Sequence, residues 1–412
     1  MRRGRCVLAA ALSMALTLVT GAAVLAQEPA PALRLETDHF VKGEGSKFLI
    51  FVSFFDAMRA YDRNPSSLRS DFQFLRAHYI DGVRIFPNWQ FGNNLFNSNG
   101  TLNSSRLAVL RAILQIAYDE GLVVDVSFAR FNMEVPEYKA ALVSAANELR
   151  DFHHIVIDIE NERDLEDRPE QFLSLGDTQD ARNMIKSADP SRIVTASNTG
   201  VSGEDGIGTA AMQVNLGLDL AAFHDPRYSD WYSWRTPWII QNMWYYWPWN
   251  VRVYLQEPQA WQDDPDENHH LLALHNSKRY GATAWTFHTR AGHDLGSQSF
   301  YDRLSAGERT FFDRVRDEMP VEGWSACNFW TSPASVVDVS SGGGYFAVYL
   351  DTRWGCSWNA YRAEPAASWV QLNSPGTGAG SSTIYFHVDA TGGGYRETKI
   401  VIGTVPITIR QQ

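Results

Sequence analysis

The sequence predicts a (β/α)8 TIM barrel followed by a small antiparallel β-sandwich domain, an α/β fold, and three observations support this prediction. Between about residues 46 and 290, an apolar segment followed by an amphipathic segment recurs eight times. The repeat averages roughly 33 residues, which is the size of one βα unit, and eight such units close a barrel of about 250 residues. After about residue 331, Gly, Ser and Thr become frequent, and short alternating segments separated by Gly-rich turns are typical of a β-sandwich.

Eight apolar segments are predicted to be the barrel strands, and they are Phe48–Phe54, Gly82–Phe86, Leu122–Phe128, Ile155–Glu160, Arg192–Ser197, Leu218–His224, Val251–Gln256 and Ala282–His288. The clearest amphipathic helices between them are Ser67–His78, Ser105–Tyr118, Pro136–Phe152 and Asp177–Ser187. Ser305–Met319 is predicted to be the last barrel helix, which Pro320 ends.

The first 26 residues are predicted to be a secretory signal peptide that takes no part in the fold. Three arginines precede an almost uninterrupted apolar run from Cys6 to Ala26, and a polar, Pro-rich stretch follows. A membrane anchor is the alternative, because the run is nearly long enough to span a bilayer. We expect cleavage near Ala26, an exported protein in the periplasm or outside the cell, a barrel domain over 35–325 and a sandwich domain over 331–412.

Composition limits the classes of partner. The chain has 412 residues, and 36 Lys and Arg stand against 47 Asp and Glu, for a formal charge of -11. This acidic balance excludes the basic surface that nucleic acids or anionic membranes require. The 14 Trp and 16 Tyr favour a surface that stacks against flat ligands, although many must be core residues. Cys327 and Cys356 are the cysteines of the predicted mature chain and could pair, and we expect a monomer.

Two glutamates follow predicted strands at the catalytic end of the barrel. Asn161-Glu162 follows the fourth strand, and Glu257 follows the seventh. Functional groups of such barrels lie where the strands end, and strands four and seven face each other across the mouth. The two carboxyl groups can therefore approach from opposite walls. A pair about 5–5.5 Å apart is what retaining glycoside hydrolysis requires.

This region resembles the clan A glycoside hydrolases, the group that includes family 5 cellulases and mannanases. The resemblance implies that Glu162 is the acid/base, that Glu257 is the nucleophile and that Asn161 contacts the sugar 2-hydroxyl. It further implies three substrate-site residues, namely Arg84 on strand two, His224 after strand six and Trp285 on strand eight. Trp89, after strand two, is also expected to contact the carbohydrate substrate.

The sequence departs from the family pattern after strand six. His224 is followed by Asp225 and Pro226, so the tyrosine that usually orients the nucleophile is missing, and Tyr228 or Tyr254 could supply its hydroxyl. A non-catalytic carbohydrate-binding protein therefore remains an alternative function. A serine esterase is disfavoured, because no Gly-x-Ser-x-Gly motif occurs.

Three other features have competing interpretations. Strand alternation places Glu160 on the same face as Glu162, and the Asn-Glu order favours Glu162. The aromatic segment 231–249 either lines the cleft or packs on the barrel wall. The acidic residues at 263–267 lack the spacing of a calcium loop, so we expect a solvated loop and neither a metal nor a cofactor.

The last 80 residues resemble BACON domains, which are small β-sandwiches appended to exported bacterial carbohydrate-active enzymes. The matching features are Cys356-Ser357-Trp358, Ala367-Ser368-Trp369-Val370, Tyr385-Phe386-His387-Val388 and Ile407-Thr408-Ile409-Arg410-Gln411. The resemblance implies either a sugar-binding module or a spacer. Trp358 and Trp369 are expected in its core rather than in a ligand platform.

Overall fold

The computed structural model describes most of the chain after the predicted signal peptide. The described residues are 32–35, 40–42, 45–89, 93–131, 133–165, 168, 172–199, 206–224, 229–246, 251–318, 329–333, 336–352, 357–379 and 382–412. The predicted signal peptide, Cys327, Cys356 and Tyr228 lie outside them. Among these residues, no helix is both long and apolar enough to cross a membrane.

Eight parallel strands form the barrel, as predicted. They are β4 (Leu49–Ser53), β5 (Gly82–Ile85), β8 (Val123–Ser127), β9 (Ile155–Asp158), β10 (Ile193–Thr195), β11 (Ala221–Phe223), β12 (Val253–Leu255) and β13 (Ala284–Phe287). Hydrogen bonding follows the order β10-β9-β8-β5-β4-β13-β12-β11. A parallel bridge between Asn198 and Phe223 joins the two ends of this order, so the sheet closes on itself.

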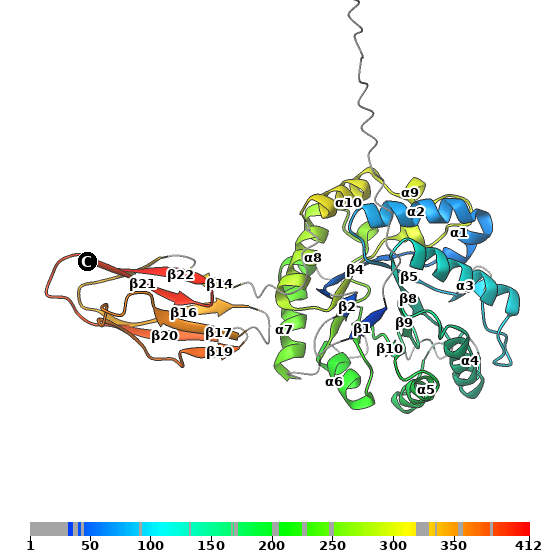
Figure 1. Ribbon diagram of the computed structural model, residues 1–412, viewed down its shortest axis with the longest axis horizontal. Coiled ribbons are helices and arrows are strands. Elements are labelled where there is room, and N and C mark those ends of the chain that lie inside the picture. The colour runs from blue at the N-terminus through cyan, green and yellow to red at the C-terminus, as the bar shows by residue number, and fades with distance from the viewer. Residues whose placement is uncertain are drawn as a thin grey trace, which may run out of the picture.

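Helices surround these strands (Figure 1). They are α1 (Ala57–Arg63), α2 (Pro65–Ala77), α3 (Ser104–Asp119), α4 (Val135–Glu148), α5 (Leu175–Ala188), α6 (Gly206–Leu216), α7 (Thr236–Tyr246), α8 (Glu267–Tyr280), α9 (Phe300–Arg303) and α10 (Ala306–Glu318). Short polar side chains fix several helix starts, because each accepts hydrogen bonds from otherwise unpaired backbone N–H groups. Asn64, Asn103, Ser174 and Asp266 do so for α2, α3, α5 and α8.

Side-chain alternation along the strands separates two environments. Phe51, Val123 and Tyr254 belong to an apolar cluster inside the barrel, whereas Ile50 and Trp285 belong to the cluster between strands and helices. A three-stranded sheet of β1 (Leu33–Leu35), β2 (Phe40–Lys42) and β3 (Gly45–Lys47) adds Leu33 and Phe40 to the inner cluster. Because the backbone N–H of Leu33 bonds to the carbonyl of His153, just before β9, this sheet covers the N-terminal end of the barrel.

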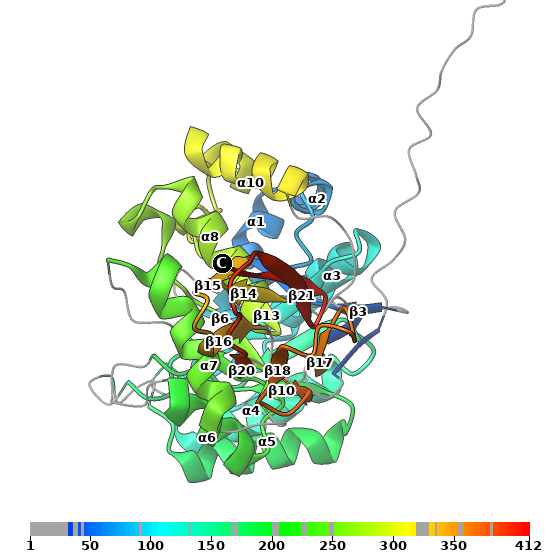
Figure 2. The same cartoon turned by 90° about the vertical axis from the view of Figure 1, so that its left-hand side faces the viewer.

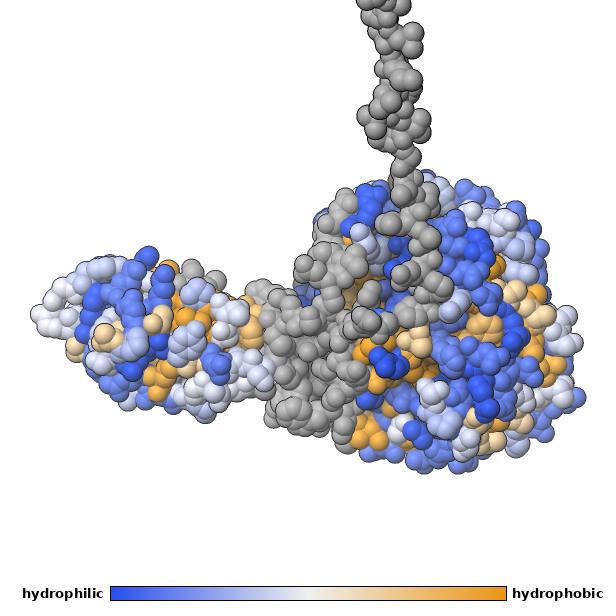
Figure 3. All heavy atoms as spheres, viewed as in Figure 1, coloured by the Kyte–Doolittle hydropathy of each residue, from blue (hydrophilic) through white to orange (hydrophobic). Residues whose placement is uncertain are grey.

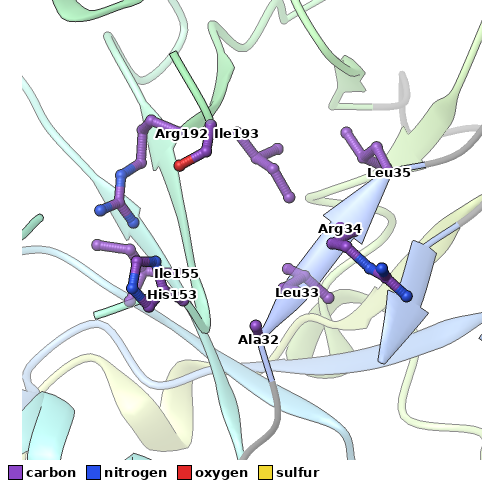
Figure 4. A pocket seen from close by; sticks show the side chains of 9 residues that line it. Ala32, Leu33, Arg34, Leu35, His153, Ile155, Arg192 and Ile193 are labelled. Carbon is purple, nitrogen blue, oxygen red and sulfur yellow. The ribbon is translucent and has the colours of Figure 1, made fainter. Parts of the chain in front are cut away.

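A cavity of about 380 Å³ lies beside this small sheet. Figure 4 shows side chains of β1 on one side of it and side chains of β9 and β10 on the other. Leu33, Leu35, Ile155 and Ile193 give it apolar walls. It is therefore at the end of the barrel opposite the predicted catalytic face.

The C-terminal domain is a two-sheet sandwich with its own core, as predicted. One sheet has the order β14-β16-β20-β18 and the other β15-β22-β21-β17-β19. The strands are β14 (Trp330–Ser332), β15 (Val336–Val339), β16 (Gly344–Asp351), β17 (Ser357–Arg362), β18 (Val370–Leu372), β19 (Thr377–Ala379), β20 (Ser382–Val388), β21 (Arg396–Ile402) and β22 (Val405–Gln411). The pairing is antiparallel except between β15 and β22, which run parallel.

The sandwich core contains Trp358, which is 5% exposed, and Trp369 packs against it half-buried, with the Arg396 guanidinium over its ring. Neither indole is a surface platform. Figure 2 shows this domain from the side, with the barrel behind it. Figure 3 shows that the described surface in its view is mainly hydrophilic, with scattered hydrophobic patches.

Candidate active site

The two predicted glutamates meet at the C-terminal mouth of the barrel. One carboxylate oxygen of Glu162, one of Glu257 and a ring nitrogen of His224 all lie within 4.8 Å of one another. Glu257 follows β12 and is 8% exposed, whereas the Glu162 side chain is 24% exposed. The pair therefore has one buried member and one that solvent reaches.

A local backbone conformation turns Glu162 toward this site. β9 ends at Asp158, and Glu162 lies in the following turn with a φ of 52°, in the left-handed region that few non-glycine residues adopt. The Ser197 hydroxyl accepts the backbone N–H of Glu162 at 3.0 Å and helps to hold this turn. Such a conformation costs free energy and commonly marks a functional position.

Glu160 points elsewhere, so the expectation that it shares a face with Glu162 is wrong. The strand has already ended, and alternation no longer applies beyond Asp158. The Glu160 side chain is fully buried and accepts the backbone N–H of Arg130 at 3.1 Å. Burial raises the pKa of Glu160 well above its usual range, with Tyr138 of α4 beside it.

Arg84, on β5, binds Glu257 from inside the barrel. Its guanidinium is fully buried and donates to Glu257 Oε1 and, at 2.7 Å, to Asn161 Oδ1. Its Nε donates to Ser127 Oγ at 2.8 Å, so the head group is fixed in one orientation. Arg84 and Asn161 therefore meet beside Glu257, and together they tie the Glu257 carboxylate to the turn that carries Glu162.

The charges around Glu257 keep it ionised. Burial alone would raise the pKa of this carboxyl, but the positive charges of His224 and Arg84 outweigh burial and lower it well below the usual glutamate value. His288 contributes in the same direction, with its Nε2 3.9 Å from Glu257 Oε2. A buried, ionised carboxylate of this kind is a ready nucleophile.

The hydrogen-bond network assigns the protons of His224. Gln256 Nε2 donates to Asp125 Oδ2 at 2.8 Å and to Asp158 Oδ2 at 3.0 Å, so the Gln256 Oε1 must face His224 Nε2, which lies 3.0 Å away. Since that oxygen only accepts, Nε2 carries a hydrogen. The ring nitrogen that gains or loses a proton is therefore Nδ1.

His224 Nδ1 faces both glutamates, 3.1 Å from Glu162 Oε1 and 3.6 Å from Glu257 Oε2. Burial lowers the pKa of His224, but the Glu257 charge and the Glu162 hydrogen bond outweigh it, and the net shift is upward. A proton can therefore be shared between Nδ1 and Glu162 directly beside the ionised Glu257.

Two buried aspartates lie under this network. Asp125 and Asp158 are both fully buried, and each accepts from Gln256. Burial, opposed by Arg84 and reinforced by the charge of Asp158, raises the pKa of Asp125 to about 6. They balance the Arg84 charge and orient Gln256, and through it His224.

The predicted role of Trp285 is wrong, and Tyr254, one of two alternatives for the missing tyrosine, does not fill that place. Trp285 faces outward, is 0% exposed and packs near Phe311 of α10 with ring centroids 6.2 Å apart, because alternation sends 284 and 286 inward and 285 outward. Tyr254 points into the barrel, but its hydroxyl donates to Asp125 at 3.0 Å and lies 3.1 Å from Thr286 Oγ1. It therefore does not replace the missing tyrosine beside the nucleophile.

His288 is the residue that the sequence interpretation missed. It directly follows β13 and continues the inward-facing series of that strand, and its Nδ1 lies 2.8 Å from Ser53 Oγ while its Nε2 faces Glu257. Asp125, Ser127 and Gln256 were missed for the same reason. Each is a polar residue at an inward position near the end of an apolar strand. The alternation of inward and outward positions along the strand was the signal that could have identified them.

The aromatic segment divides between core and surface. Trp231 is buried, and its Nε1 donates to Asp264 at 2.8 Å, whereas Trp234 is 52% exposed and stacks on Trp238 with centroids 5.7 Å apart. The side chains of residues 244–250 and of Trp89 lie outside the described residues. In the acidic loop, Asp266 caps α8 and Asp263 pairs with Arg290 at 3.1 Å, as in an ordinary polar loop.

Glu162, His224 and Glu257 are also close enough to contact one metal ion. The Arg84 guanidinium already bonds Glu257 Oε1, and His224 is shifted toward its cationic form. These two groups supply the positive charge that a divalent cation would bring, so the donor set fits a proton-transfer site better than a metal site.

Comparison with solved structures identifies the fold. An endo-1,4-β-mannanase from Rhizomucor miehei matches with a TM-score of 0.54 at 14% identity, over 70% of this chain and 99% of that one. A GH5_18 structure from Streptomyces cattleya in complex with Manβ1-4GlcNAc matches with a TM-score of 0.52 at 15% identity, over 70% of this chain and 84% of that one. The barrel has the glycoside hydrolase family 5 fold.

A family 5 glycoside hydrolase from Bacteroides vulgatus matches 87% of this chain and 93% of its own, with a TM-score of 0.53 at 13% identity. This match extends beyond the barrel into the C-terminal domain. By sequence, no protein-family model and no curated protein matches the chain.

Proposed function

We propose that this protein is an exported retaining glycoside hydrolase that cleaves β-linked sugars in a polysaccharide or oligosaccharide. The observation that carries the proposal is the approach of the Glu162 and Glu257 carboxylate oxygens to within 4.8 Å. Retaining glycosidases have carboxyl groups about 5–5.5 Å apart, whereas inverting enzymes need about 6.5–9.5 Å to admit a water molecule.

In the first step, Glu257 attacks the anomeric carbon. Its carboxylate is ionised and held by Arg84 on Oε1, which leaves Oε2 for bond formation. Glu162 donates its proton to the departing glycosidic oxygen as the C–O bond breaks. A glycosyl ester of Glu257 forms, and the leaving group departs as an alcohol.

In the second step, Glu162 acts as the base. Once Glu257 is esterified, its negative charge is gone, and Glu162 takes a proton from an incoming water that attacks the anomeric carbon from the opposite side. Two inversions give net retention. Asn161, tied to Arg84, is placed to contact the sugar hydroxyl next to the reacting carbon.

His224 couples the two carboxylates in this scheme. Its Nδ1 lies 3.1 Å from Glu162 Oε1 and stabilises the Glu162 carboxylate formed in the first step, until Glu162 recovers a proton from water in the second step. Gln256 holds the ring by its other nitrogen, so the ring keeps its orientation while Nδ1 exchanges its proton. This role substitutes in part for the tyrosine that the family pattern would place near the nucleophile.

Mannose-containing β-1,4-linked chains are the substrate class that the comparisons favour. The similar structures include an endo-1,4-β-mannanase and a protein complexed with Manβ1-4GlcNAc. The predicted signal peptide supports export, and the BACON-like sequence pattern supports a carbohydrate-associated C-terminal module on a monomeric chain.

Glu162→Gln and Glu257→Gln test the mechanism. On β-1,4-mannan we expect each to lower kcat by about 10²-fold to 10⁴-fold. On an aryl β-mannoside with an activated leaving group, Glu162→Gln should be much less impaired, because that leaving group needs no proton, whereas Glu257→Gln should stay inactive. Glu160→Gln is the matched control and should keep near-normal kcat in the folded protein.

The first product released by the wild-type chain, followed by NMR, should have the β configuration. An α product would exclude the double-displacement scheme. If wild type and Glu257→Gln were equally inert on a broad glycoside panel while both bound sugars, the barrel would be a carbohydrate-binding protein instead.

A further inference from the structure

The outer face of the sheet β14-β16-β20-β18 presents three exposed tyrosines. Tyr345 is 75% exposed, Tyr349 44% and Tyr385 54%. Tyr345 and Tyr349 lie on β16, and Tyr385 lies on the neighbouring strand β20. Because alternate residues of a strand point to the same side, all three share the face that points away from the sandwich core.

The register spaces these rings evenly. Tyr385 pairs with Ala347, so its diagonal neighbours on β16 are Tyr345 and Tyr349, each roughly 7–8 Å away in such a sheet. The two β16 tyrosines are roughly 13 Å apart along the strand. Ala347 between them is small and leaves the Tyr385 ring open to solvent, so the three rings form a continuous aromatic track, here called the tyrosine track.

The tyrosine track carries little charge. The segments 345–349, 370–372 and 383–387 contain no Lys, Arg, Asp or Glu. Their other outward residues are Ala347, Gln371, Thr383 and His387, whose ring lies 4.7 Å from that of Tyr345. Asp389 follows β20, lies 3.2 Å from His387 Nδ1 and accepts from Gln371 Nε2 at 3.2 Å, so the fixed charge at this edge is negative and disfavours an anionic ligand.

The other sheet of the same domain has a different outer face. Asp338, Glu397, Lys399 and Arg410 are exposed there, and Arg410 pairs with Glu397 at 3.0 Å. The first face therefore carries three exposed tyrosines on its strands, whereas the second carries one, Tyr361, together with more charged side chains.

A neutral sugar chain has the chemistry to occupy the tyrosine track. Sugar rings present flat faces of C–H groups that cover aromatic rings, and the phenol hydroxyls and the Thr383 side chain offer hydrogen bonds at the ring edges. A protein partner of stable affinity would need a more apolar central patch than three tyrosines interleaved with Ala, Thr and Gln.

We propose that the tyrosine track is a second carbohydrate-binding surface that holds a neutral polysaccharide chain, separate from the barrel mouth. The choice of β-1,4-mannan as its ligand rests on the proposed function, but binding at the track does not depend on catalysis. Its role is to keep the protein bound to an insoluble polysaccharide substrate.

The test uses the full mature chain carrying Glu257→Gln, so that the matrix is not consumed. Binding to insoluble β-1,4-mannan, with microcrystalline cellulose and insoluble xylan in parallel, is measured by depletion from solution. We expect Tyr345→Ala with Tyr385→Ala to weaken binding to at least one matrix roughly tenfold or more. Tyr361→Ala is the matched control, since Tyr361 is 51% exposed on β17 of the opposite sheet.

Three results would overturn the proposal. The protein with all three tyrosines intact could bind none of the three matrices, or the Tyr361→Ala control could lose as much affinity as the double variant. The third is a dimer in light scattering that Tyr345→Ala dissociates. The same tyrosine variants in the wild-type background should hydrolyse a soluble aryl β-mannoside at the wild-type rate. If that substrate is not hydrolysed at all, the proposed function fails while the depletion result still decides the binding surface.

Discussion

The mouth and the floor of the barrel are built from the same strands but differ in chemistry. At the floor, the inward residues are Leu49, Phe51, Val123, Val156, Ile193 and Leu220, and Leu33 and Phe40 pack with them. One or two pleats further along, the inward residues are Arg84, Asp125, Ser127, Asp158, Gln256 and His288, all nearly inaccessible. The floor gains stability from apolar burial, whereas the mouth spends stability to hold charges out of water.

This comparison teaches where the molecule tolerates change. A buried charge network is held by mutual pairing, so removal of one member leaves the others unpaired. An apolar floor loses only the contacts of the removed side chain. Substitutions at the mouth should therefore lower both stability and activity, whereas substitutions at the floor should lower stability alone.

The largest effect is expected for Arg84→Met. It leaves Glu257, Asp125 and Asp158 without their shared cation, so we expect a loss of about 3–5 kcal/mol in the free energy of unfolding. We also expect kcat/KM to fall by about 10²-fold to 10³-fold, because the nucleophile is no longer oriented. Urea unfolding and steady-state kinetics measure both.

Arg192→Met is the control at the other end of the barrel. Arg192 is also buried, and its guanidinium donates to the carbonyls of Phe152 and Leu149 and pairs with Asp189. Its loss should destabilise the fold without changing kcat/KM of the folded fraction. Equal activity losses in the two variants would contradict the separation of mouth and floor.

Phe40→Ala should lower stability alone. Its side chain is fully buried in the inner apolar cluster, so truncation should cost about 3–5 kcal/mol through lost contacts and a cavity. We expect the kcat/KM of the folded protein at 25 °C to stay within about twofold of wild type. A large activity loss at full folding would show that the floor transmits strain to the mouth.

The smallest effect is a shift in pH profile. The pKa of His224 is raised above the ordinary value of 6.5, so the proton that it shares with Glu162 should be lost only above that pH. The lowered pKa of Glu257 keeps the nucleophile ionised below pH 4.5. The profile of kcat/KM should therefore have its acidic limb below pH 4.5 and its alkaline limb above pH 6.5.

His224→Asn should move the alkaline limb toward lower pH, because the imidazole whose raised pKa sets that limb is removed. The contribution of His224 to stability has the same sign: it is present below pH 6.5 and is lost as the pH rises through the raised pKa. An alkaline limb that stays in place in His224→Asn would assign the proton to another group.

Much of the architecture follows from local sequence. The eight strand segments were found because apolar runs recur at the length of one βα unit, and all eight occur in the closed sheet. The starts of the four clearest helices were placed within two residues, because apolar residues recur at helical spacing, and the structure shows that Asn103 and Ser174 cap two of them. The convergence of Glu162 and Glu257 followed from strand order alone, since strands four and seven oppose each other.

The failures have a common cause. Trp285 was taken from a family pattern, but the strand parity that makes it outward-facing depends on its register with β4 and β12. Glu160 was misjudged because β9 ends two residues earlier than expected and the chain then turns at Glu162. Side-chain direction at a strand end depends on where the ladder stops, and neighbouring strands decide that.

The sequence by itself determined the order of the units, the apolar strands, the helix caps and the presence of an acid after strands four and seven. These depend on residue periodicity and on interactions within a few residues. The tertiary structure decided which side chains are inward, that Gln256 fixes the tautomer of His224 and that His288 faces Glu257. Those facts depend on contacts between residues far apart in the chain, which exist only once the barrel has closed.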